Sequence, residues 1–300
     1  MSRVLVSGAS GLIGSALVSF LEAQRVQVTR LVRRRPKSPL ETRWNPTHPV
    51  APALVSGFDA VVHLSGENVA GIWTEAKKER IRESRVRSTL NLAGALAKAD
   101  RPPRTFLCAS AIGYYGNRGE EILDEASPSG DGFLPEVCRE WEFAGEAAAD
   151  AGIRTINLRI GIVLSRSGGA LKPMLVPFRF GLGGKIGDGR QWWSWIHITD
   201  LVSAVHHCLQ NPAIPPGPVN LVSPNPVTNA EFTRALADLL KRPAALTVPA
   251  FAARLLLGEF ADEGLLASAR VKPKRLLGSG FQFRHPELRA ALADLLGRRA

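Results

Sequence analysis

Cysteine is scarce, and the few cysteines show no metal-binding pattern. The 300-residue chain has only Cys108, Cys138 and Cys208, which lie far apart within apolar segments. An odd number of widely separated cysteines predicts neither a disulfide framework nor a zinc site, and buried free thiols are the simplest interpretation. The HExxH, CxxC and Walker lysine patterns are also absent. This excludes the usual metal hydrolases and P-loop nucleotide hydrolases, and we predict no metal site.

Long apolar runs are absent as well. The most apolar stretch, residues 251–257, contains Arg254 and is far shorter than the roughly 20 residues that span a bilayer. Residues 1–7 lack the apolar core and the cleavage site of a secretory signal. We therefore predict a cytoplasmic protein without a membrane partner.

Acidic residues are fewer than basic ones: 27 Asp and Glu stand against 38 Lys and Arg, which gives a net charge of +11. Such an excess can attract nucleic acid. The densest basic segment is confined to residues 25–43, however, and cations elsewhere are mostly mixed with acids, as in residues 75–87. We predict no nucleic-acid partner, and we expect residues 25–43 to face an anionic group of a small ligand.

Short apolar runs alternate with amphipathic ones along most of the chain. Strand-like runs occur at residues 4–6, 26–32, 60–64, 106–109, 155–158 and 219–222, and helical patterns at residues 12–21, 75–97, 137–149 and 199–209. This order predicts an α/β protein with a doubly wound parallel sheet of the Rossmann type. Five prolines between residues 35 and 52 predict a loop in place of a second crossover helix.

A glycine-rich turn connects the first predicted strand to the first helix. It reads GASGLIG, residues 8–14, so Gly8, Gly11 and Gly14 recur every third position. Glycines at this place let a dinucleotide pyrophosphate approach the backbone, and the helix N-terminus then faces the phosphates. The context of strand, turn and helix predicts a dinucleotide site rather than a turn without a ligand.

The end of the second predicted strand distinguishes NAD from NADP. An acid there accepts the ribose hydroxyl of NAD, whereas an arginine receives the 2′-phosphate of NADP. Residues 29–35 read TRLVRRR and contain no acid, so we predict NADP(H) as the cofactor, with Arg33 and Arg34 as phosphate ligands. The alternative is that these arginines only cover a solvated loop, which suits Arg35 best.

The pattern changes after about residue 165, where Gly-rich and Trp-rich segments interrupt the alternation. Helical patterns then dominate the C-terminal part, at residues 229–240, 251–257 and 286–296. We predict a dinucleotide-binding domain of residues 1–165, completed by about 197–222. Residues 166–196 and 223–300 would form a smaller, mainly helical substrate or cap region.

Longer motifs follow the glycine turn in order: HLSGEN (63–68), SRVRST (84–89), SAIGYYG (110–116), LRIGIVLS (158–165), GLGGKIGDGRQ (181–191), WIHITD (195–200), RLLLGE (254–259) and PKRLLGSGFQFRHPEL (273–288). Together with GASGLIG they resemble the extended and atypical short-chain dehydrogenase/reductases. The resemblance is strongest to the YfcH-like NAD(P)-binding subgroup of epimerase-family proteins, which has a short C-terminal domain of unknown function, and it covers nearly the whole chain.

The resemblance implies cofactor contacts at several positions. The pyrophosphate would be held by Gly8, Ser10, Gly11, Leu12, Ile13 and Gly14. The adenine-ribose side would be lined by Leu64, Ser65 and Gly66, with a further contact from Arg85. The nicotinamide ribose would lie over Ala109, Ser110 and Ala111.

Active members of this superfamily use a Ser, a Tyr and a Lys four residues after the Tyr, in which the phenol exchanges a proton while hydride moves. Ser110 matches the Ser, but Leu134 and Cys138 stand where the Tyr and the Lys belong. The chain has only two tyrosines, Tyr114 and Tyr115, which follow a predicted strand end. One of them could supply the proton together with Ser110, or the pair could only shape the wall of the cleft.

Residues 181–197 combine polar anchors with flat apolar side chains, a mixture that suits a substrate cleft. We predict substrate contacts at Lys185, Arg190, Gln191, Trp195 and His197, and the two cations favour an anionic small-molecule substrate. The glycines of this segment also permit simple tight turns, and His197 and Thr199 fit a structural role at a helix start equally well.

Two functions are consistent with these features. The first is an NADP(H)-dependent oxidoreductase or epimerase-like enzyme that acts on a small carbonyl or hydroxyl substrate. The second is a catalytically silent NADP(H)-binding sensor or scaffold, because the Tyr and Lys pair is missing. The sequence leaves the substrate, the reaction direction and the oligomeric state open.

Overall fold

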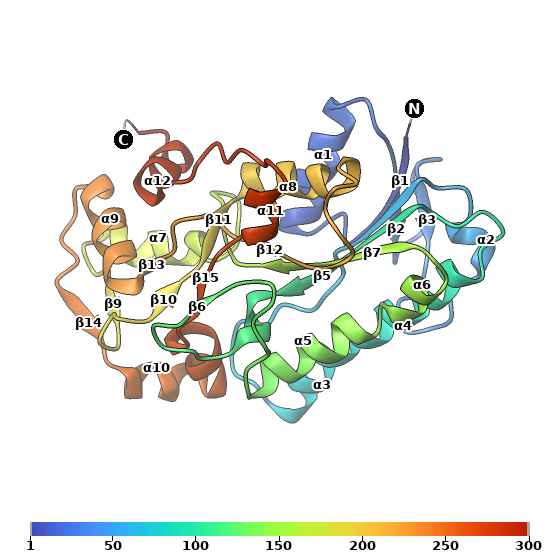
Figure 1. Cartoon of the computed structure of the whole chain (residues 1–300). Coiled ribbons are helices and arrows are strands. Elements are labelled where there is room, and N and C mark those ends of the chain that lie inside the picture. The colour runs from blue at the N-terminus through green and yellow to red at the C-terminus, as the bar shows by residue number, and fades with distance from the viewer. Residues whose placement is uncertain (1, 299–300) are drawn as a thin grey trace.

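The computed structural model describes residues 2–298, and its centre is a parallel sheet of seven strands. The strand order is β12-β7-β5-β4-β1-β2-β3, and every neighbouring pair is parallel (Figure 1). The strands are β1 (Arg3–Ser7), β2 (Gln27–Val32), β3 (Glu41–Arg43), β4 (Ala60–His63), β5 (Thr105–Ala111), β7 (Arg154–Ile160) and β12 (Gly217–Leu221). The predicted doubly wound α/β fold is confirmed.

Helices cover both faces of this sheet (Figure 1). On one face α1 (Leu12–Ala23) packs beside α8 (Ile198–Gln210). On the other lie α3 (Glu75–Glu83), α4 (Val86–Ala97), α5 (Phe133–Phe143) and α6 (Glu146–Asp150), with α2 (Pro52–Val55) against α4. Leu17, Val18 and Leu21 of α1 are almost completely buried in the main core.

Two predicted helices are divided in the structure. The pattern over residues 75–97 forms α3 and α4, which separate at Ser84 and Arg85, and the pattern over residues 137–149 forms α5 and α6. At the first break, Ser84 Oγ and Arg85 Nη1 both donate to the Ile81 carbonyl. These side chains bind a carbonyl near the end of α3, where carbonyls lack helical partners. The proline-rich stretch, predicted as loop, also contains β3, which extends the sheet beside β2.

The remaining elements form short sheets and helices outside the seven-stranded sheet, and several of them surround a second core. Short strand pairs are β8 (Ile162–Leu164) with β11 (Trp195–His197), β10 (Trp192–Trp193) with β13 (Val227–Thr228), β9 (Gly184–Ile186) with β14 (Leu246–Val248), and β6 (Ile122–Leu123) with β15 (Arg270–Val271). The helices are η1 (Ile112–Tyr115), α7 (Leu171–Arg179), α9 (Asn229–Leu240), α10 (Ala250–Leu257), η2 (Ala261–Leu266), α11 (Lys274–Gly278) and α12 (Leu288–Leu296).

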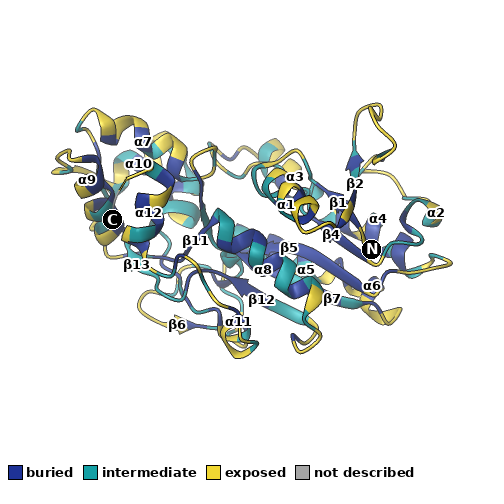
Figure 2. Cartoon of the chain, turned by 90° about the horizontal axis from the view of Figure 1, so that it is seen from above, coloured by how far each residue is buried: buried dark blue, intermediate teal, exposed yellow. Residues whose placement is uncertain are grey.

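Burial follows this layered arrangement. Figure 2 shows dark, buried strands between the helices, whereas the C-terminal helices have exposed outer faces. The second core joins Trp195 and Phe232 to apolar residues of α7 and α12. All three cysteines are free and buried, as predicted, and burial raises the pKa of each thiol to about 12. Within residues 2–298, no helix has the length and apolar character needed to cross a membrane.

Candidate functional site

The candidate site lies where the order of the strands in the sheet reverses, between β1 and β4. Strands β1 and β4 are neighbours, but β2 and β3 continue to one side of β1, and β5, β7 and β12 continue to the other side of β4. Ser7 and His63 pair at the ends of these two strands. Open α/β sheets bind their ligands in the crevice beyond such strand ends.

Glycine is required at this crevice because two backbone segments touch. Gly8 has φ +69°, and a Cβ there would lie 2.6 Å from both the carbonyl carbon and the carbonyl oxygen of Leu64. A Cβ on Gly14 would collide with the Gly8 carbonyl and lie 2.8 Å from Ala9 Cα. The turn therefore presents bare backbone, which is the surface that a pyrophosphate needs.

The N-terminus of α1 is open to an anion. Its N-cap residue is Gly11, no side chain of residues 2–298 caps this end, and the first turn contains no acid. The first helical N–H groups of any helix lack carbonyl partners within it, and they carry the positive end of the helix dipole. The residues of the turn therefore fit a dinucleotide phosphate.

The two predicted phosphate ligands differ in their surroundings. Arg34 donates two hydrogen bonds to Glu41 on β3, at 2.8 and 2.6 Å. This contact, with a bond from the Lys37 amide, lowers the pKa of Glu41 to about 2, and the same pair raises the pKa of Arg34. Arg33 forms no ion pair or hydrogen bond with any residue between 2 and 298. Arg33 is thus the freer of the two cations, and Glu41 is a partner that the sequence did not reveal.

Buried hydroxyls connect the two loops of the crevice. Ser7 Oγ lies 2.6 Å from His63 Nδ1, accepts from the Leu64 amide at 3.2 Å, and accepts from Ser65 Oγ at 3.1 Å. His63 Nε2 lies 3.1 Å from Ser88 Oγ, and burial lowers the pKa of His63 to about 3. A neutral His63 therefore fixes the loop that carries the predicted adenine-side residues.

Arg85 has a positioning role. It donates to the Glu67 carbonyl at 2.9 Å and stacks over Trp141 with its guanidinium carbon 5.1 Å from the ring centroid. A Cβ on Gly66 would lie 3.3 Å from that guanidinium. Arg85 is thus bound to protein groups and holds the loop at residues 64–67, and its direct contact with the cofactor stays a prediction.

Ser110 points into a buried ion pair. Its hydroxyl donates to Glu142 Oε1 at 2.7 Å, and Glu142 also accepts two bonds from Arg159, each at 2.8 Å. Ser110 and Arg159 are only 2% and 3% exposed. Burial lowers the pKa of Arg159, but the contact with Glu142 outweighs burial and raises it, so Arg159 stays charged. The hydroxyl proton of Ser110 is therefore engaged by Glu142, and the catalytic role of Ser110 stays a prediction.

The two tyrosines have different environments. Tyr115 is fully buried, donates to Asn220 Oδ1 at 2.7 Å and accepts from Arg159 at 3.0 Å. Burial, only partly offset by Arg159, raises the pKa of Tyr115 to about 12. This environment argues against the predicted catalytic role of Tyr115. Tyr114 is half-buried over Arg159, whose guanidinium carbon lies 3.5 Å from the ring centroid. Its hydroxyl bonds to no residue that the structure describes.

Leu134 and Cys138, which stand at the predicted positions of the missing Tyr and Lys, lie close to η1. A Cβ on Gly113 would lie 3.4 Å from Leu134 Cβ and 3.9 Å from Cys138 Sγ. Both residues of α5 therefore face η1, which carries Tyr114. Strand alternation also places Ala111 on the face opposite Ser110. The structure thus offers apolar groups at this end of the cleft.

Three of the five predicted substrate residues are parts of the fold. Gln191 donates to the Ile186 and Leu265 carbonyls, and Trp195 donates to the Asn225 carbonyl from within the second core. His197 is 1% exposed and caps α8 by accepting from the Thr199 amide at 3.1 Å. The three side chains are thus bonded to backbone groups inside the protein, which argues against the predicted substrate contacts. Arg190 is exposed and Lys185 is half-buried.

His197, His285 and Asp294 are close enough together to suggest a cation site, with potential ligand atoms within 4.8 Å of one another. However, His197 Nδ1 accepts the Thr199 amide, so the neutral ring carries its proton on Nε2. That nitrogen points toward Asp294 Oδ2 at 3.4 Å. Burial, then the neighbouring His285, lower the pKa of His197 to about 4. The N–H faces the position a metal would need, so the cluster is better explained as packing between α8 and α12.

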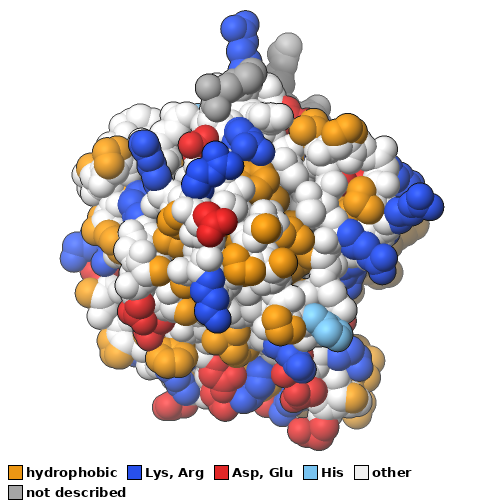
Figure 3. All heavy atoms as spheres, turned by 90° about the vertical axis from the view of Figure 1, so that its right-hand side faces the viewer, with side chains coloured by type: hydrophobic (Ala, Val, Ile, Leu, Met, Phe, Trp, Pro, Cys, Tyr) orange, Lys and Arg blue, Asp and Glu red, His pale blue; other side chains and the backbone are white. Residues whose placement is uncertain are grey.

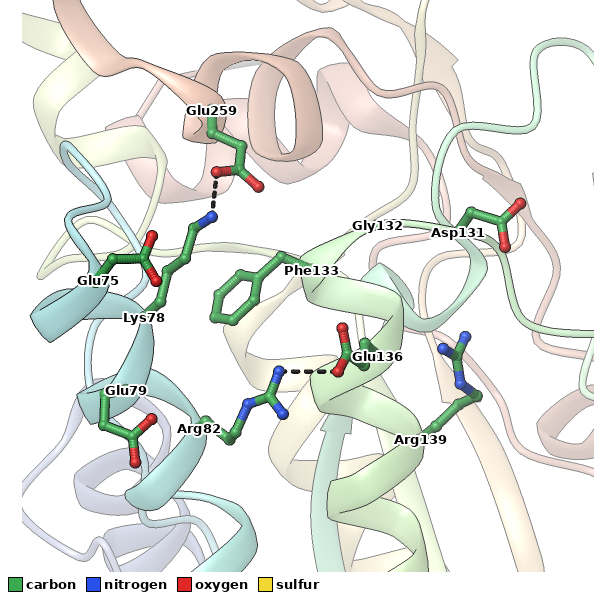
Figure 4. Close-up of a pocket in the computed structure, with 10 residues that line it drawn as sticks. All are labelled: Glu75, Lys78, Glu79, Arg82, Asp131, Gly132, Phe133, Glu136, Arg139 and Glu259. Carbon is green, nitrogen blue, oxygen red and sulfur yellow. Dashed lines mark hydrogen bonds and ion pairs between the residues drawn. The ribbon is translucent and has the colours of Figure 1, made fainter.

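A cavity of about 560 Å³ lies between α3, α5 and the segment before η2 (Figure 4). Figure 4 shows Phe133 between Lys78 and Arg82, which pair with Glu259 and Glu136. Nearby, Glu263 accepts the Phe133 and Leu134 amides at 2.8 and 2.7 Å and so caps α5. The Lys78–Glu259 ion pair and this cap connect residues 259–263 to α3 and α5. The cavity therefore lies at a packing contact between the C-terminal part and these helices.

The surface charge is interspersed on the face that Figure 3 shows. Lys and Arg side chains alternate there with acidic and apolar groups instead of forming one continuous basic area. The absence of a nucleic-acid partner stays a prediction.

Comparisons with known proteins agree with this geometry. The family model for the NAD dependent epimerase/dehydratase family matches residues 4–221, and a domain of unknown function, DUF1731, matches residues 248–295. The chain belongs to the NAD dependent epimerase/dehydratase family. The resemblance drawn from the motifs is thereby confirmed.

Relatives of this epimerase-family chain share nearly its full length. Epimerase family protein Mb2239 of Mycobacterium bovis is 44% identical over 291 residues, 96% of each chain. The crystal structure of human epimerase family protein SDR39U1 (isoform 2) with NADPH has a TM-score of 0.91 at 35% identity and covers 99% of this chain and 100% of that one. A nucleoside-diphosphate sugar epimerase from Corynebacterium glutamicum has a TM-score of 0.83 at 40% identity, covering 99% of this chain and 58% of that one.

Replacing Glu142 by Gln should destabilise this epimerase-family protein by about 3 kcal/mol, because it leaves the buried Arg159 charge without its counter-ion. Glu140→Gln on the same helix is the matched control, since Glu140 pairs with the partly exposed Arg82 and should cost less than about 1 kcal/mol. Urea unfolding followed by circular dichroism measures both. Equal losses in the two variants would show that the buried pair has no special role.

Proposed function

We propose that the chain binds NADP(H) at the crevice between β1 and β4. The observation that carries this proposal is the glycine turn, in which only bare backbone fits at Gly8 and Gly14, next to an uncapped α1. The unpaired Arg33 at the end of β2 supports NADP(H) over NAD(H). The NADPH in the crystal structure of the human relative supports the same choice.

The cofactor contacts follow from this placement. The pyrophosphate is held by the backbone of Gly8, Ser10, Gly11, Leu12, Ile13 and Gly14, and Arg33 receives the 2′-phosphate. Arg34 supports it from its pair with Glu41. Leu64, Ser65 and Gly66 line the adenine side, and Ala109 lies on the strand beneath the nicotinamide ribose. When bound, the nicotinamide supplies or accepts a hydride.

The proposed activity is that of an oxidoreductase or epimerase-like enzyme on a small carbonyl or hydroxyl substrate. Tyr114 is then the proton-exchanging residue, because its hydroxyl bonds to no described residue whereas Ser110 and Tyr115 are engaged inside the protein. Arg159 orients the Tyr114 ring from below by a cation–π contact. Arg190 is exposed in residues 181–197, the predicted substrate segment, and is a candidate for contact with an anionic substrate.

A second function, an NADP(H)-binding sensor or scaffold in the cytoplasm, is favoured by one observation. Leu134 and Cys138 place apolar groups against η1 where a phenol and an ammonium would be needed for conventional proton transfer. Cofactor binding would then be retained without turnover, and a protein partner would replace the substrate.

The glycine turn is tested by Gly14→Ala, whose Cβ collides with the Gly8 carbonyl. NADPH affinity should fall at least about tenfold, since the turn must open or the phosphate must retreat. Gly94→Ala is the matched control, because a Cβ at Gly94 in α4 has no neighbour within 4 Å. Fluorescence titration with NADPH measures both, and unchanged binding by Gly14→Ala would overturn the proposed site.

The choice of cofactor is tested by Arg33→Asp. A carboxylate there repels the 2′-phosphate, so NADPH affinity should fall about 10- to 100-fold while NADH affinity stays the same or rises. Arg35→Asp, in the same basic segment, serves as the control for general charge effects. If both variants lose NADPH affinity equally, the effect is diffuse attraction, and Arg33 has no specific role.

Turnover distinguishes the two proposed functions. We expect NADPH oxidation with at least one member of a panel of small carbonyl compounds, and a loss of about 100-fold or more in kcat for Tyr114→Phe with NADPH binding retained. Absorbance at 340 nm follows the reaction. Turnover undiminished in Tyr114→Phe would remove the phenol from the mechanism, and no turnover on any compound would favour the sensor.

A further inference from the structure

A second polar cavity lies in the C-terminal part of the chain, apart from the dinucleotide crevice. It measures about 390 Å³ and is formed by one face of α9, the β9 strand and residues 242–247. In Figure 1, α9, β9 and β14 lie at the opposite end of the molecule from β1 and β2. This cavity is therefore independent of the proposed cofactor site.

Three cations from different segments line the cavity. They are Lys185 on β9, Arg234 on α9 and Arg242 in the loop that follows α9. None of them forms an ion pair with a residue between 2 and 298, and Lys185 Nζ contacts only the Asp188 carbonyl, at 3.3 Å. Convergent cations without counter-ions are the usual way in which a protein binds an anion.

The single acid among the lining residues does not neutralise these cations. Asp238 lies on α9 and is 3.9 Å from Arg289 of α12, which is not part of the lining. Its charge is thus shared with a cation outside the cavity. The cavity keeps a positive excess, which an anionic ligand would compensate.

The walls leave room for a compact ligand. Four of the lining residues are alanines, at positions 230, 237, 244 and 245, so short side chains keep the space open. Thr233 also lines it, and its buried hydroxyl has no hydrogen-bond partner in the part of the chain that the structure describes. A threonine in a helix normally bonds to the carbonyl one turn earlier, and a buried hydroxyl without a partner is costly.

We propose that this cavity is a binding site for a small phosphorylated molecule. Arg234 and Arg242 bind the phosphate oxygens from the two sides of the opening, and Lys185 neutralises the remaining charge. The sequence predicted Lys185 as a ligand for an anionic substrate, and the structure places it in this cavity. The bound molecule would hold β9 and the loop after α9 together.

The test is calorimetric titration with inorganic pyrophosphate at low ionic strength, with NADPH in excess so that the glycine turn is occupied. Wild-type protein should bind pyrophosphate, and the double variant Arg234→Gln, Arg242→Gln should bind it at least about tenfold more weakly. Lys241→Gln is the matched control, because Lys241 precedes Arg242 on the chain but is not a lining residue. All the substituted side chains are exposed, so the variants should keep the wild-type Tm.

Each outcome decides the proposal. Loss of affinity in the double variant alone supports a built site. No binding by wild-type protein, unchanged binding by the double variant, or an equal loss in Lys241→Gln overturns it, the last result indicating diffuse charge attraction only. If NADPH itself does not bind, the proposed cofactor function fails, but the comparison between the double variant and Lys241→Gln still reports on this cavity.

Discussion

The buried ion pair between Arg159 and Glu142 sets the chemistry of this fold. Two charges withdrawn from water are tolerated only when each of their hydrogen-bonding atoms has a partner. Arg159 meets this requirement with Glu142 and the Tyr115 hydroxyl, and Glu142 also accepts from Ser110. Ser110, which matches the conventional catalytic Ser, is thereby used to satisfy the pair. The Ser110 and Tyr115 hydroxyls near the end of β5 are therefore both engaged inside the protein.

Tyr114 contacts the same ion pair without a hydrogen bond to it. Its ring lies on the guanidinium face of Arg159, so the ring is oriented without any hydrogen bond from its own hydroxyl to the described residues. A cation beneath an aromatic ring is attracted to the negative face of the ring, which fixes the plane of the phenol. The structure therefore combines a dinucleotide crevice with one phenol, Tyr114, that has no hydrogen-bond partner among the described residues. The proposed enzyme requires a substrate at that phenol, whereas the proposed sensor does not.

Local patterns in the sequence were enough to predict the sheet and the glycine turn. Strand and helix periods depend on neighbouring residues, and the glycine turn GASGLIG is only seven residues long. The break between α3 and α4 was missed, and the side chains at the break bond to the loop at residue 67: Arg85 donates to the Glu67 carbonyl, and Ser84 accepts from the Glu67 amide. Glu41 was missed because it lies on β3, and the prolines around β3 predicted a loop there.

The errors at the site have one physical origin. A tryptophan or glutamine in a Gly-rich segment suits a ligand cleft and a core equally well, and only the three-dimensional packing decides between them. Trp195 and Gln191 lie against carbonyls from residues 225, 186 and 265, which no local pattern brings together. Lys185 stays at a cavity for the opposite reason: its Cα lies on a strand beside α9, and no carboxylate of residues 2–298 forms an ion pair with it. Burying a lysine ammonium without a partner is costly, so the side chain remains where water or an anion can reach it.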